Sequence, residues 1–504
     1  MDQEKQYTER EALYEELFAL RQEVLAKGQD LFQVWKPNIH RRSFYFSAWN
    51  LAFYLSLRCH DLRKLQKSLL PLGLSSLGRS EARAIANLDV VMASLGRICH
   101  KPEAELVNYP SWKLFFYGDK LLSHNNKLIF GSHNACQTHI MVTLPTEATE
   151  DYGLVRDLVQ SGMDCARINC AHDDRDKWAA MIKHIRSAEK ETGNCCKIYM
   201  DLAGPKARIS AILVRGGEAR IQVGDMLFLA SGAISNYPDE FAGDFVMTCS
   251  IPEIFQHLQV GDPVLIDEGK LKAQVAGLTD EGAYLKVTYT KPKGGRIKGQ
   301  KSLNFPQTDL DISPLTQKDL ADLDFVAAVA DAIGYSFVKR GADIKLLQDE
   351  LKKRRGNDAN KIVIIAKIET KEAVSHLPEI IVQAASQQPL GIMIARGDLA
   401  VEVGYRRMSE LQEEILWICE AAHIPVIWAT QVLENMVKTG MPSRAEITDA
   451  AMGERAECVM LNKGPYIVKA VASLADILNR MKQHQHKKAP QLKALNIAIN
   501  AFEK

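Results

Sequence analysis

The sequence lacks net charge. Its 504 residues include 63 Lys and Arg against 62 Asp and Glu, which leaves a formal charge of +1. A chain with this balance has no overall field that would draw it onto nucleic acid or an anionic lipid surface. We therefore expect no nucleic-acid partner, and any charged ligand must be bound by a local group of side chains.

Regularly spaced cysteines are also missing. The ten cysteines are scattered, without the CxxC pairs that indicate a zinc site or the short spacings of a disulfide framework. We interpret them as buried free thiols, which are typical of the reducing cytoplasm.

No apolar run has the length of a membrane span. The most apolar stretch, residues 43–57, includes Asn50 and is shorter than the roughly 18–20 residues that a spanning helix needs. The opening residues, MDQEKQYTER, have neither the basic nor the apolar region of a secretory signal. We expect a buried helix at 43–57 and no membrane partner.

The chain is too long for one ordinary core, because domains usually hold about 100–200 residues and barrels about 250. Up to about residue 122, apolar side chains recur at helical spacing, as at Leu13 and Leu17. Ser80 is a candidate N-cap within this region. We therefore expect an all-α domain over residues 1–128, which carries no chemical motif.

After residue 131 the pattern changes to short β-rich runs, each followed by roughly 12–20 residues of helical periodicity. This alternation is typical of parallel βα units, and eight of them predict a closed (β/α)8 TIM barrel built from residues 129–208 and 307–482. The runs are residues 139–144, 164–169, 197–201, 332–338, 362–368, 391–395, 425–429 and 458–461.

Residues 209–306 interrupt this rhythm with alternating segments such as ARIQV and YLKVTY, which predict an inserted β-barrel domain. The tripeptide VGD occurs at 223–225 and again at 260–262. This is weak evidence for an internal repeat, since such turns are common in β domains. The tail, residues 483–504, is basic at first and ends in a short apolar piece that would dock as a helix or stay loose.

Charged residues gather where the predicted barrel strands end, and TIM-barrel active sites lie at the carboxyl ends of strands. Glu369 and Asp398 offer the hard oxygen ligands that Mg²⁺ or Mn²⁺ prefers. Lys367 is two residues from Glu369, so both side chains point to the same side of their strand. Each such residue alone is usually a solvated surface group, but five of the eight units carry complementary charges.

Several segments resemble, in order and spacing, the signature segments of pyruvate kinases, and they cover roughly residues 137–482. They are MDCARINCAH (163–172), DLAGPKAR (201–208), IAKIE (365–369), GIMIARGDL (391–399), ATQVLE (429–434), PSRAE (442–446) and CVML (458–461). The resemblance implies transfer of the phosphoryl group of phosphoenolpyruvate to ADP, giving pyruvate and ATP.

The resemblance also implies roles for individual residues. Glu369 and Asp398 would bind the divalent ion, Lys367 would stabilise the moving phosphoryl group, and Thr430 would lie near the carbon that is protonated. The backbone at the start of a helix, at Ala395, Arg396 and Gly397, would hold the substrate carboxylate. Lys301 would contact the nucleotide when the inserted domain closes as a lid. The residues that would hold phosphate groups are Arg167, Asn169, His172, Arg208, Lys301 and Ser336.

The potassium site of the family is altered here. Many pyruvate kinases bind K⁺ through an Asn, a Ser and an Asp; Asn169 and Asp201 remain, but the Ser position is Ala171. Lys206 stands where K⁺-dependent enzymes often have Glu, and an ammonium there would supply the charge of the monovalent ion and repel a second cation. We predict that K⁺ is not required; the alternative is a decayed site.

The eighth strand differs further from the family, because MLNKGP at 460–465 stands where the family has MLSGETA, and the Ser and Glu of that motif are missing. That Ser belongs to the network that delivers the proton, so Thr430 and water would act alone, or Asn462 and Lys463 would bind an additional anion. The family's C-terminal regulatory domain is not found in the sequence, and the helical domain has no counterpart. The helices or the barrel would support a homo-oligomer.

Two rival functions stay open. One is a metal-dependent lyase or aldolase acting on a 2-oxo acid, although a lid lysine for nucleotide phosphate argues against it. The other is a regulatory protein that binds phosphoenolpyruvate or pyruvate without turnover and uses its helical domain to contact a partner.

Overall fold

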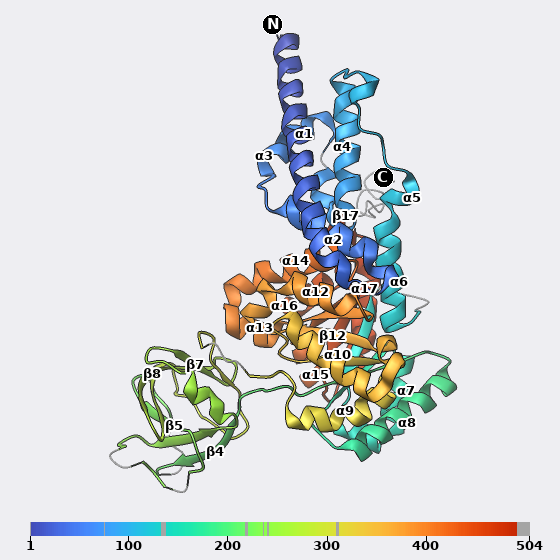
Figure 1. Cartoon of the computed structure of the whole chain (residues 1–504). Helices are drawn as coiled ribbons and strands as arrows, with labels where there is room; N and C mark the ends of the chain where they lie inside the picture. The colour runs from blue at the N-terminus through green and yellow to red at the C-terminus, as the bar shows by residue number, and fades with distance from the viewer. Residues whose placement is uncertain are drawn as a thin grey trace, which may run out of the picture.

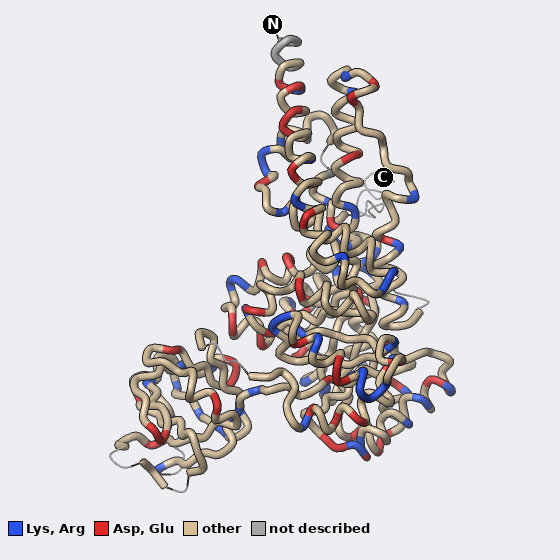
Figure 2. Tube along the Cα trace, in the orientation of Figure 1, with Lys and Arg blue, Asp and Glu red and all other residues tan. Residues whose placement is uncertain are grey.

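The computed structural model describes residues 2–74, 76–132, 138–216, 220–234, 236–238, 241–308 and 312–490. Cys136 and residues 491–504 of the tail therefore lie outside the described residues. A helical region, a closed barrel and a separate β sheet make up the described chain, and the sheet stands to one side of the barrel (Figure 1). Positive and negative side chains are interspersed over all three parts (Figure 2), as the balanced composition predicts.

Eight parallel strands close into a barrel in the order β1-β15-β14-β13-β12-β11-β3-β2. The strands are β1 (His139–Thr143), β2 (Cys165–Asn169), β3 (Lys197–Asp201), β11 (Ala332–Tyr335), β12 (Val363–Ile368), β13 (Leu390–Ala395), β14 (Val426–Ala429) and β15 (Cys458–Leu461). Each coincides with one predicted run, so the TIM-barrel fold is confirmed. The strands are almost wholly buried, because helices cover the barrel and leave no water-facing side for polar residues.

Helices follow the strands, and some of them begin at recognisable caps. Ser443 and Glu446 form a capping box at the start of α16, and Thr316 and Asp319 form another at α9. The barrel helices are α7 (Tyr152–Gln160), α8 (Arg175–Thr192), α9 (Gln317–Val329), α10 (Gly341–Arg355), α11 (Lys371–Ser375), α12 (Leu377–Ala385), α13 (Arg396–Val403), α14 (Tyr405–Ala421), α15 (Glu434–Thr439), α16 (Arg444–Gly453) and α17 (Ile467–Met481).

The insertion is a seven-stranded sheet of order β10-β7-β8-β9-β5-β6-β4. Its strands are β4 (Ile209–Val214), β5 (Met226–Ala230), β6 (Phe245–Cys249), β7 (Pro263–Ile266), β8 (Leu271–Thr279), β9 (Gly282–Tyr289) and β10 (Leu303–Asn304). An isolated bridge between Arg208 and Ser302 joins the two edges of the sheet, and Ile209 N donates to Lys301 O at 2.8 Å. The sheet therefore curls toward a barrel, as expected for the insertion.

The repeated VGD tripeptide forms a similar turn at both of its positions in this sheet. The carboxylate of Asp225 accepts a hydrogen bond from Gln222 N at 2.7 Å, and that of Asp262 accepts one from Gln259 N at 3.0 Å. The glycine of each turn has a positive φ and donates its N–H to a strand carbonyl. The sheet thus uses the same turn twice, with glycine where other residues are strained.

The N-terminal region is helical, as predicted, and packs on the barrel. Its helices are α1 (Asp2–Trp35), α2 (Tyr45–Arg58), α3 (Arg63–Leu69), α4 (Ala84–Ile98), α5 (Trp112–Phe115) and α6 (Tyr117–Phe130). The apolar stretch at 43–57 forms the buried α2, which confirms that expectation. No helix in the described ranges combines the length and apolarity of a membrane span.

Ser80 stands at the predicted N-cap position, but its side chain does not cap the helix. Its hydroxyl donates to Leu77 O at 2.7 Å and accepts from Asn87 at 2.8 Å, and it makes no cap bond to the short helix that begins at Glu81. Contacts to a preceding turn and to α4 compete with the cap for the same oxygen. The sequence pattern could not reveal those partners.

Polar contacts fix the helical region to the amino-terminal end of the barrel. Asn50 Nδ2 donates to Glu81 O and, at 2.8 Å, to Ala421 O at the end of α14. The buried His423 ring lies 2.8 Å from Ser47 Oγ and 3.1 Å from Ala82 O. A short hairpin of β16 (Gln485–His486) and β17 (Ala489–Pro490) packs at the same end.

Candidate active site

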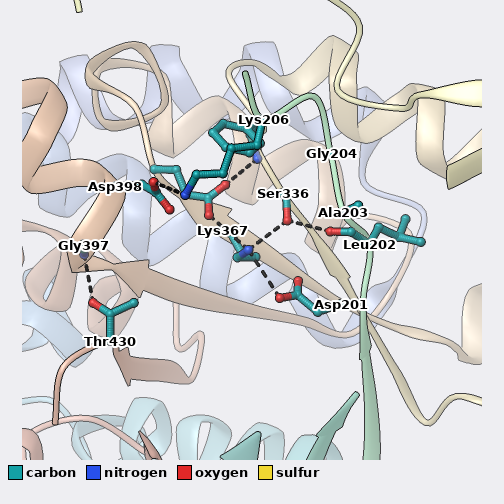
Figure 3. Close-up of polar contacts among 12 residues, drawn as sticks. Asp201, Leu202, Ala203, Gly204, Lys206, Ser336, Lys367, Gly397, Asp398 and Thr430 are labelled. Carbon is teal, nitrogen blue, oxygen red and sulfur yellow. Dashed lines mark hydrogen bonds and ion pairs between the residues drawn. The ribbon is translucent and has the colours of Figure 1, made fainter. Parts of the chain in front are cut away.

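Lys367 is the centre of a polar group at the carboxyl end of β12 (Figure 3). Its Nζ lies 2.8 Å from Ser336 Oγ, 3.0 Å from Glu369 Oε1 and 3.4 Å from Asp201 Oδ2. The period-two rule placed Lys367 and Glu369 on one side of the strand, and the structure agrees. Three strands, β3, β11 and β12, thus converge on one ammonium group.

Burial would by itself lower the pKa of Lys367, but the charges of Asp201 and Glu369 raise it above its ordinary value. For Asp201, burial would raise the pKa, whereas Lys367 and Arg167 hold it below its ordinary value. The lysine is therefore charged at neutral pH in a buried site, where a fixed charge acts strongly on a ligand.

Asp201 is fully engaged by its neighbours. Arg167 Nε donates to Asp201 Oδ2 at 3.0 Å, and the buried Tyr199 hydroxyl donates to Oδ1 at 3.1 Å. Arg167 also donates to Thr143 Oγ1 at 2.9 Å. The carboxylate thus orients Arg167 and Lys367, the two cations that strands β2 and β12 carry.

Glu369 and Asp398 line the same hollow, which has a volume of about 370 Å³. Glu369 Oε2 accepts from Phe337 N at 2.6 Å. Burial raises the pKa of Glu369, Lys367 opposes the rise, and the negative charge of Asp398 adds to it. Two carboxylates in one hollow fit a divalent cation, and one oxygen of Asp398 has no hydrogen-bond partner among the described residues.

Lys206 pairs with Asp398, with Nζ 2.6 Å from Oδ1 (Figure 3). We expected this ammonium at the altered potassium site with Asp201, whose carboxylate is instead bound by Arg167 and Lys367. Lys206 therefore brings its charge to the side of the hollow where the divalent ion would bind.

The start of α13 lies against the loop after β14. Gly397 N donates to Thr430 Oγ1 at 2.8 Å, so this N–H is already engaged. The Arg396 guanidinium donates to Ala429 O and Thr430 O, and it binds both oxygens of Asp449. The Arg396 side chain therefore shapes the Thr430 loop, and only its backbone remains for a substrate.

A second hollow of about 350 Å³ lies at the carboxyl ends of β1, β2 and β15 and is lined by Arg167, Asn169, His172, Asn462 and Lys463. Burial lowers the pKa of His172, and the charges of Lys463, Arg208 and Arg167 lower it further. Lys463 has no ion pair among the described residues, which leaves its charge available for an anion.

Lys301 and Ser336 have contacts other than the phosphate-binding ones expected from the sequence. Lys301 lies on the inserted sheet, where it pairs with Asp267 at 3.0 Å and lines neither hollow. Ser336 is 1% exposed, and its hydroxyl donates to Leu202 O and accepts from Lys367. Arg208 Nη1 donates to Gln300 O at 3.0 Å.

The sequence did not single out Tyr199 and Asp449. Tyr199 stands two residues before Asp201 on β3, so the period-two rule would have found it. Asp449 has no such signal, because its partner Arg396 is 53 residues away.

A closed barrel with a lysine and carboxylates at its strand ends defines a TIM-barrel enzyme that handles charged small molecules. The family model "Pyruvate kinase, barrel domain" matches residues 135–471. The chain therefore belongs to the pyruvate kinase family, which consists of phosphotransferases.

Individual relatives agree with this assignment. A pyruvate kinase of Agrobacterium vitis is 34% identical over 67% of this chain and 68% of its own length. One of Geobacillus stearothermophilus is 30% identical over 69% of this chain but only 57% of its own length. The crystal structure of a pyruvate kinase from Cryptosporidium parvum has a TM-score of 0.60 and 27% identity, covering 71% of this chain and 70% of that one.

Proposed function

We propose that this chain transfers the phosphoryl group of phosphoenolpyruvate to ADP, giving pyruvate and ATP, with Mg²⁺ or Mn²⁺ held by Glu369 and Asp398. The position of Lys367 carries the proposal. Its ammonium lies between Glu369 and Asp201 at the end of the barrel where such enzymes act. Relatives named pyruvate kinase support the same reaction.

Lys367 supplies a fixed positive charge to the moving phosphoryl group. Ser336, Glu369 and Asp201 hold its Nζ, so the charge needs no rearrangement during transfer. The divalent ion, when bound, neutralises further charge on the phosphoryl oxygens.

Thr430 is the proposed route for the proton that converts the enolate into pyruvate. Its Oγ1 accepts from Gly397 N, and its hydroxyl hydrogen has no acceptor among the described residues. The hydroxyl can therefore donate toward a ligand at the start of α13. Water would replace the Ser and Glu that the eighth strand lacks.

ADP would place its phosphates in the second hollow, against Arg167, Asn169, His172 and Lys463. We propose that the inserted sheet then closes as a lid and brings Lys301 and Arg208 to the nucleotide. The open position of the sheet in Figure 1 is compatible with such a movement.

K⁺ independence is part of the proposal. Ala171 lacks the hydroxyl that would be one potassium ligand. Arg167 and Lys367 form ion pairs with the Asp201 carboxylate, and the Lys206 ammonium forms one with Asp398. Initial rates should be equal in K⁺ and in a bulky organic cation at the same ionic strength. Strict dependence on K⁺ would contradict this part.

The test of the reaction is pyruvate formation from phosphoenolpyruvate with ADP and Mg²⁺. Lys367→Met should reduce the rate about 10²–10³-fold, the usual cost of removing one fixed electrostatic group. Lys361→Met is the matched control, because that lysine is exposed and its ion-pair partner among the described residues is the exposed Asp358. Equal inactivity of the wild type and Lys367→Met would refute the proposal.

The Lys206–Asp398 pair favours a second candidate, a protein that binds phosphoenolpyruvate or pyruvate without turnover. The ammonium would then occupy the place of the divalent ion. Binding of phosphoenolpyruvate with no pyruvate release at high protein concentration would support this candidate over the first.

We also propose a cytoplasmic homo-oligomer that associates through its barrel or its N-terminal helices. Trp112 is 81% exposed and Leu114 is 46% exposed on α5, which gives the helical region an apolar surface. Light scattering of wild type and Trp112→Ser would test whether this surface is used.

A further inference from the structure

The hydroxyl group of Tyr199 lies next to the polar group at the carboxyl end of the barrel, on the side of the barrel interior. Tyr199 is on β3, two residues before Asp201, so both side chains point to the same side of that strand. The tyrosine is fully buried inside the barrel, in a cluster of apolar residues to which all eight strands contribute. Its phenol oxygen is therefore a polar atom at the boundary between the apolar interior and the site.

The two oxygens of the Asp201 carboxylate have different partners. Oδ2 accepts from Arg167 Nε at 3.0 Å and lies 3.4 Å from Lys367 Nζ. Oδ1 accepts from the Tyr199 hydroxyl at 3.1 Å, and no other described residue donates to it. Asp201 is only 1% exposed, so water has no room to replace that donor. The phenol therefore satisfies the one oxygen that the cations leave free.

Gly334 provides the space for this hydroxyl. It lies opposite Asp201 in the register of β11 and β3. A Cβ atom at this position would lie 2.1 Å from the Tyr199 hydroxyl oxygen and 2.4 Å from Asp201 Oδ1, closer than unbonded atoms approach each other. Glycine inside a strand weakens the strand and often marks a place where another group approaches closely. The glycine and the tyrosine are therefore matched across neighbouring strands.

The hydrogen bond from Tyr199 acts on the rotation of the Asp201 carboxylate. The torsion that turns a carboxylate has broad minima, so the aspartate side chain alone does not fix the plane of its two oxygens. A donor on Oδ1 together with the cations on Oδ2 fixes that plane, and hydrogen bonds to a charged group are among the stronger ones in proteins. The positions of Arg167 and Lys367, which both contact Oδ2, therefore depend on the tyrosine.

The phenol is a permanent donor in this place. Burial, and next the negative charge of Asp201, raise the pKa of Tyr199 well above its ordinary value, although Arg167 opposes the rise. Tyr199 therefore keeps its proton at neutral pH. The tyrosine always donates in this contact, and the aspartate always accepts.

We propose that Tyr199 is a positioning residue for the phosphoryl transfer proposed above. Its hydroxyl fixes the Asp201 carboxylate, and the carboxylate fixes the two cations of the site, Arg167 and Lys367. Gly334 belongs to the same arrangement, because any side chain there would displace the hydroxyl. The inference rests on the proposed function for its kinetic test, and a second test needs no reaction.

Tyr199→Phe removes only the hydroxyl and keeps the buried ring. In the pyruvate assay, kcat should fall about tenfold, because charges that shift by a fraction of an ångström stabilise the transition state less. KM for phosphoenolpyruvate should change less than kcat, since both cations remain in the site. A role in packing alone would lower the melting temperature and leave kcat per folded molecule unchanged.

Tyr335→Phe is the matched control. Tyr335 is as fully buried as Tyr199 and lies on β11, next to Gly334. Its hydroxyl has no hydrogen-bond partner among the described residues. The control therefore removes a buried phenol oxygen that positions nothing, and its kcat should equal that of the wild type.

Gly334→Ala tests the same contact from the neighbouring strand. The new Cβ displaces the hydroxyl, so kcat should fall at least as far as in Tyr199→Phe. In the double variant the two effects on kcat should be far from additive, because each substitution alone already breaks the same hydrogen bond. Melting temperatures of all variants show which fraction of each protein is folded in the assay.

A measurement without substrate separates this inference from the proposed reaction. In ¹⁵N spectra the Nε–H signal of Arg167 reports on its bond to Asp201, and Arg167→Lys identifies that signal. The signal should shift or broaden in Tyr199→Phe and stay unchanged in Tyr335→Phe.

The inference is overturned if the wild type is active and Tyr199→Phe has the same kcat. It is also overturned if the Arg167 signal of Tyr199→Phe matches that of the wild type, or if activity falls only with the folded fraction. A wild type that forms no pyruvate would instead refute the proposed function, and the Arg167 signal would then decide whether Tyr199 positions that cation.

Discussion

Asp201 at the carboxyl end of the barrel and two glutamates at the amino end have pKa shifts of opposite direction. At the carboxyl end, Asp201 is surrounded by Arg167, Lys367 and Tyr199, and its pKa lies below the ordinary value. At the amino end, Glu420 and Glu454 have no such partners, and burial raises their pKa to about 7. Burial alone does not decide the pKa of a carboxyl group; the charges of both signs around it also contribute.

This difference assigns the ends different tasks. At the carboxyl end, Asp201, Arg167 and Lys367 form a cluster of charges that are already fixed, as electrostatic catalysis requires. The amino end holds groups whose uncharged form is favoured by burial, such as His423, Glu420 and Glu454. The predictions below test that contrast, from the largest expected effect to the smallest.

Removing Asp201 should have the largest effect on stability. In Asp201→Asn, Arg167 and Lys367 lose their common charge partner, and breaking a buried pair costs about 3–5 kcal/mol. Urea unfolding measures the loss. Asp358→Asn, which alters only an exposed pair with Lys361, should leave the free energy of unfolding nearly unchanged. Equal stability of the two variants would contradict the fixed-charge account.

His423 should make the amino end sensitive to acid. Burial lowers its pKa to about 4, so the unfolded chain binds a proton below about pH 6.5 that the folded chain refuses. The neutral His423 therefore contributes to the free energy of unfolding at neutral pH. This contribution, about 3 kcal/mol at most, is lost as the pH falls from about 6.5 to 4.

His423→Gln isolates this effect, because Glu420 and Glu454 stay in both proteins. Their raised pKa stabilises the folded state at low pH, and that contribution is lost as pH rises toward 7. The difference in unfolding free energy between wild type and His423→Gln should shrink toward pH 4. A difference that is independent of pH would contradict the prediction.

Asp449 should act on the reaction through Arg396. Asp449→Asn removes the carboxylate that holds the guanidinium against the Thr430 carbonyl, so kcat should fall about tenfold with a smaller change in KM. Asp476→Asn, at an exposed pair on α17, is the control. If both kcat and KM of Asp449→Asn match the wild type, the positioning role is wrong.

Lys463 should have the smallest effect. Its charge is among the causes that lower the pKa of His172, so Lys463→Ala should raise that pKa. Because Lys463 is exposed, KM for ADP should rise only a few-fold. Histidine NMR follows the titration, and Lys469→Ala, on α17 outside the hollow, is the control. An unchanged His172 titration would contradict the placement of Lys463.

The barrel was predictable because its strands carry local signals. Parallel strands buried on both faces read as continuous apolar runs, and period two linked Lys367 to Glu369. The resemblance of the strand-end segments then supplied roles for residues such as Arg167 and Thr430, and the family assignment is confirmed.

The sequence could not reveal partners that are distant along the chain. Lys206 was expected near Asp201 but pairs with Asp398, and Ser80 was expected as a cap but contacts Asn87. A cavity beneath the barrel joins residues 79–127 to residues 454–489, which no local pattern relates. Such pairings depend on how the helical region and hairpin pack, and their periodicity does not encode that packing.

Phosphorus NMR of the chain with phosphoenolpyruvate, ADP and Mg²⁺ tests the central claim most directly. The account predicts that the phosphoenolpyruvate signal is replaced, one for one, by the γ-phosphate signal of ATP, and that Lys367→Met largely abolishes the exchange. A phosphoenolpyruvate signal that stays unchanged, or that is converted into inorganic phosphate without ATP, would contradict it.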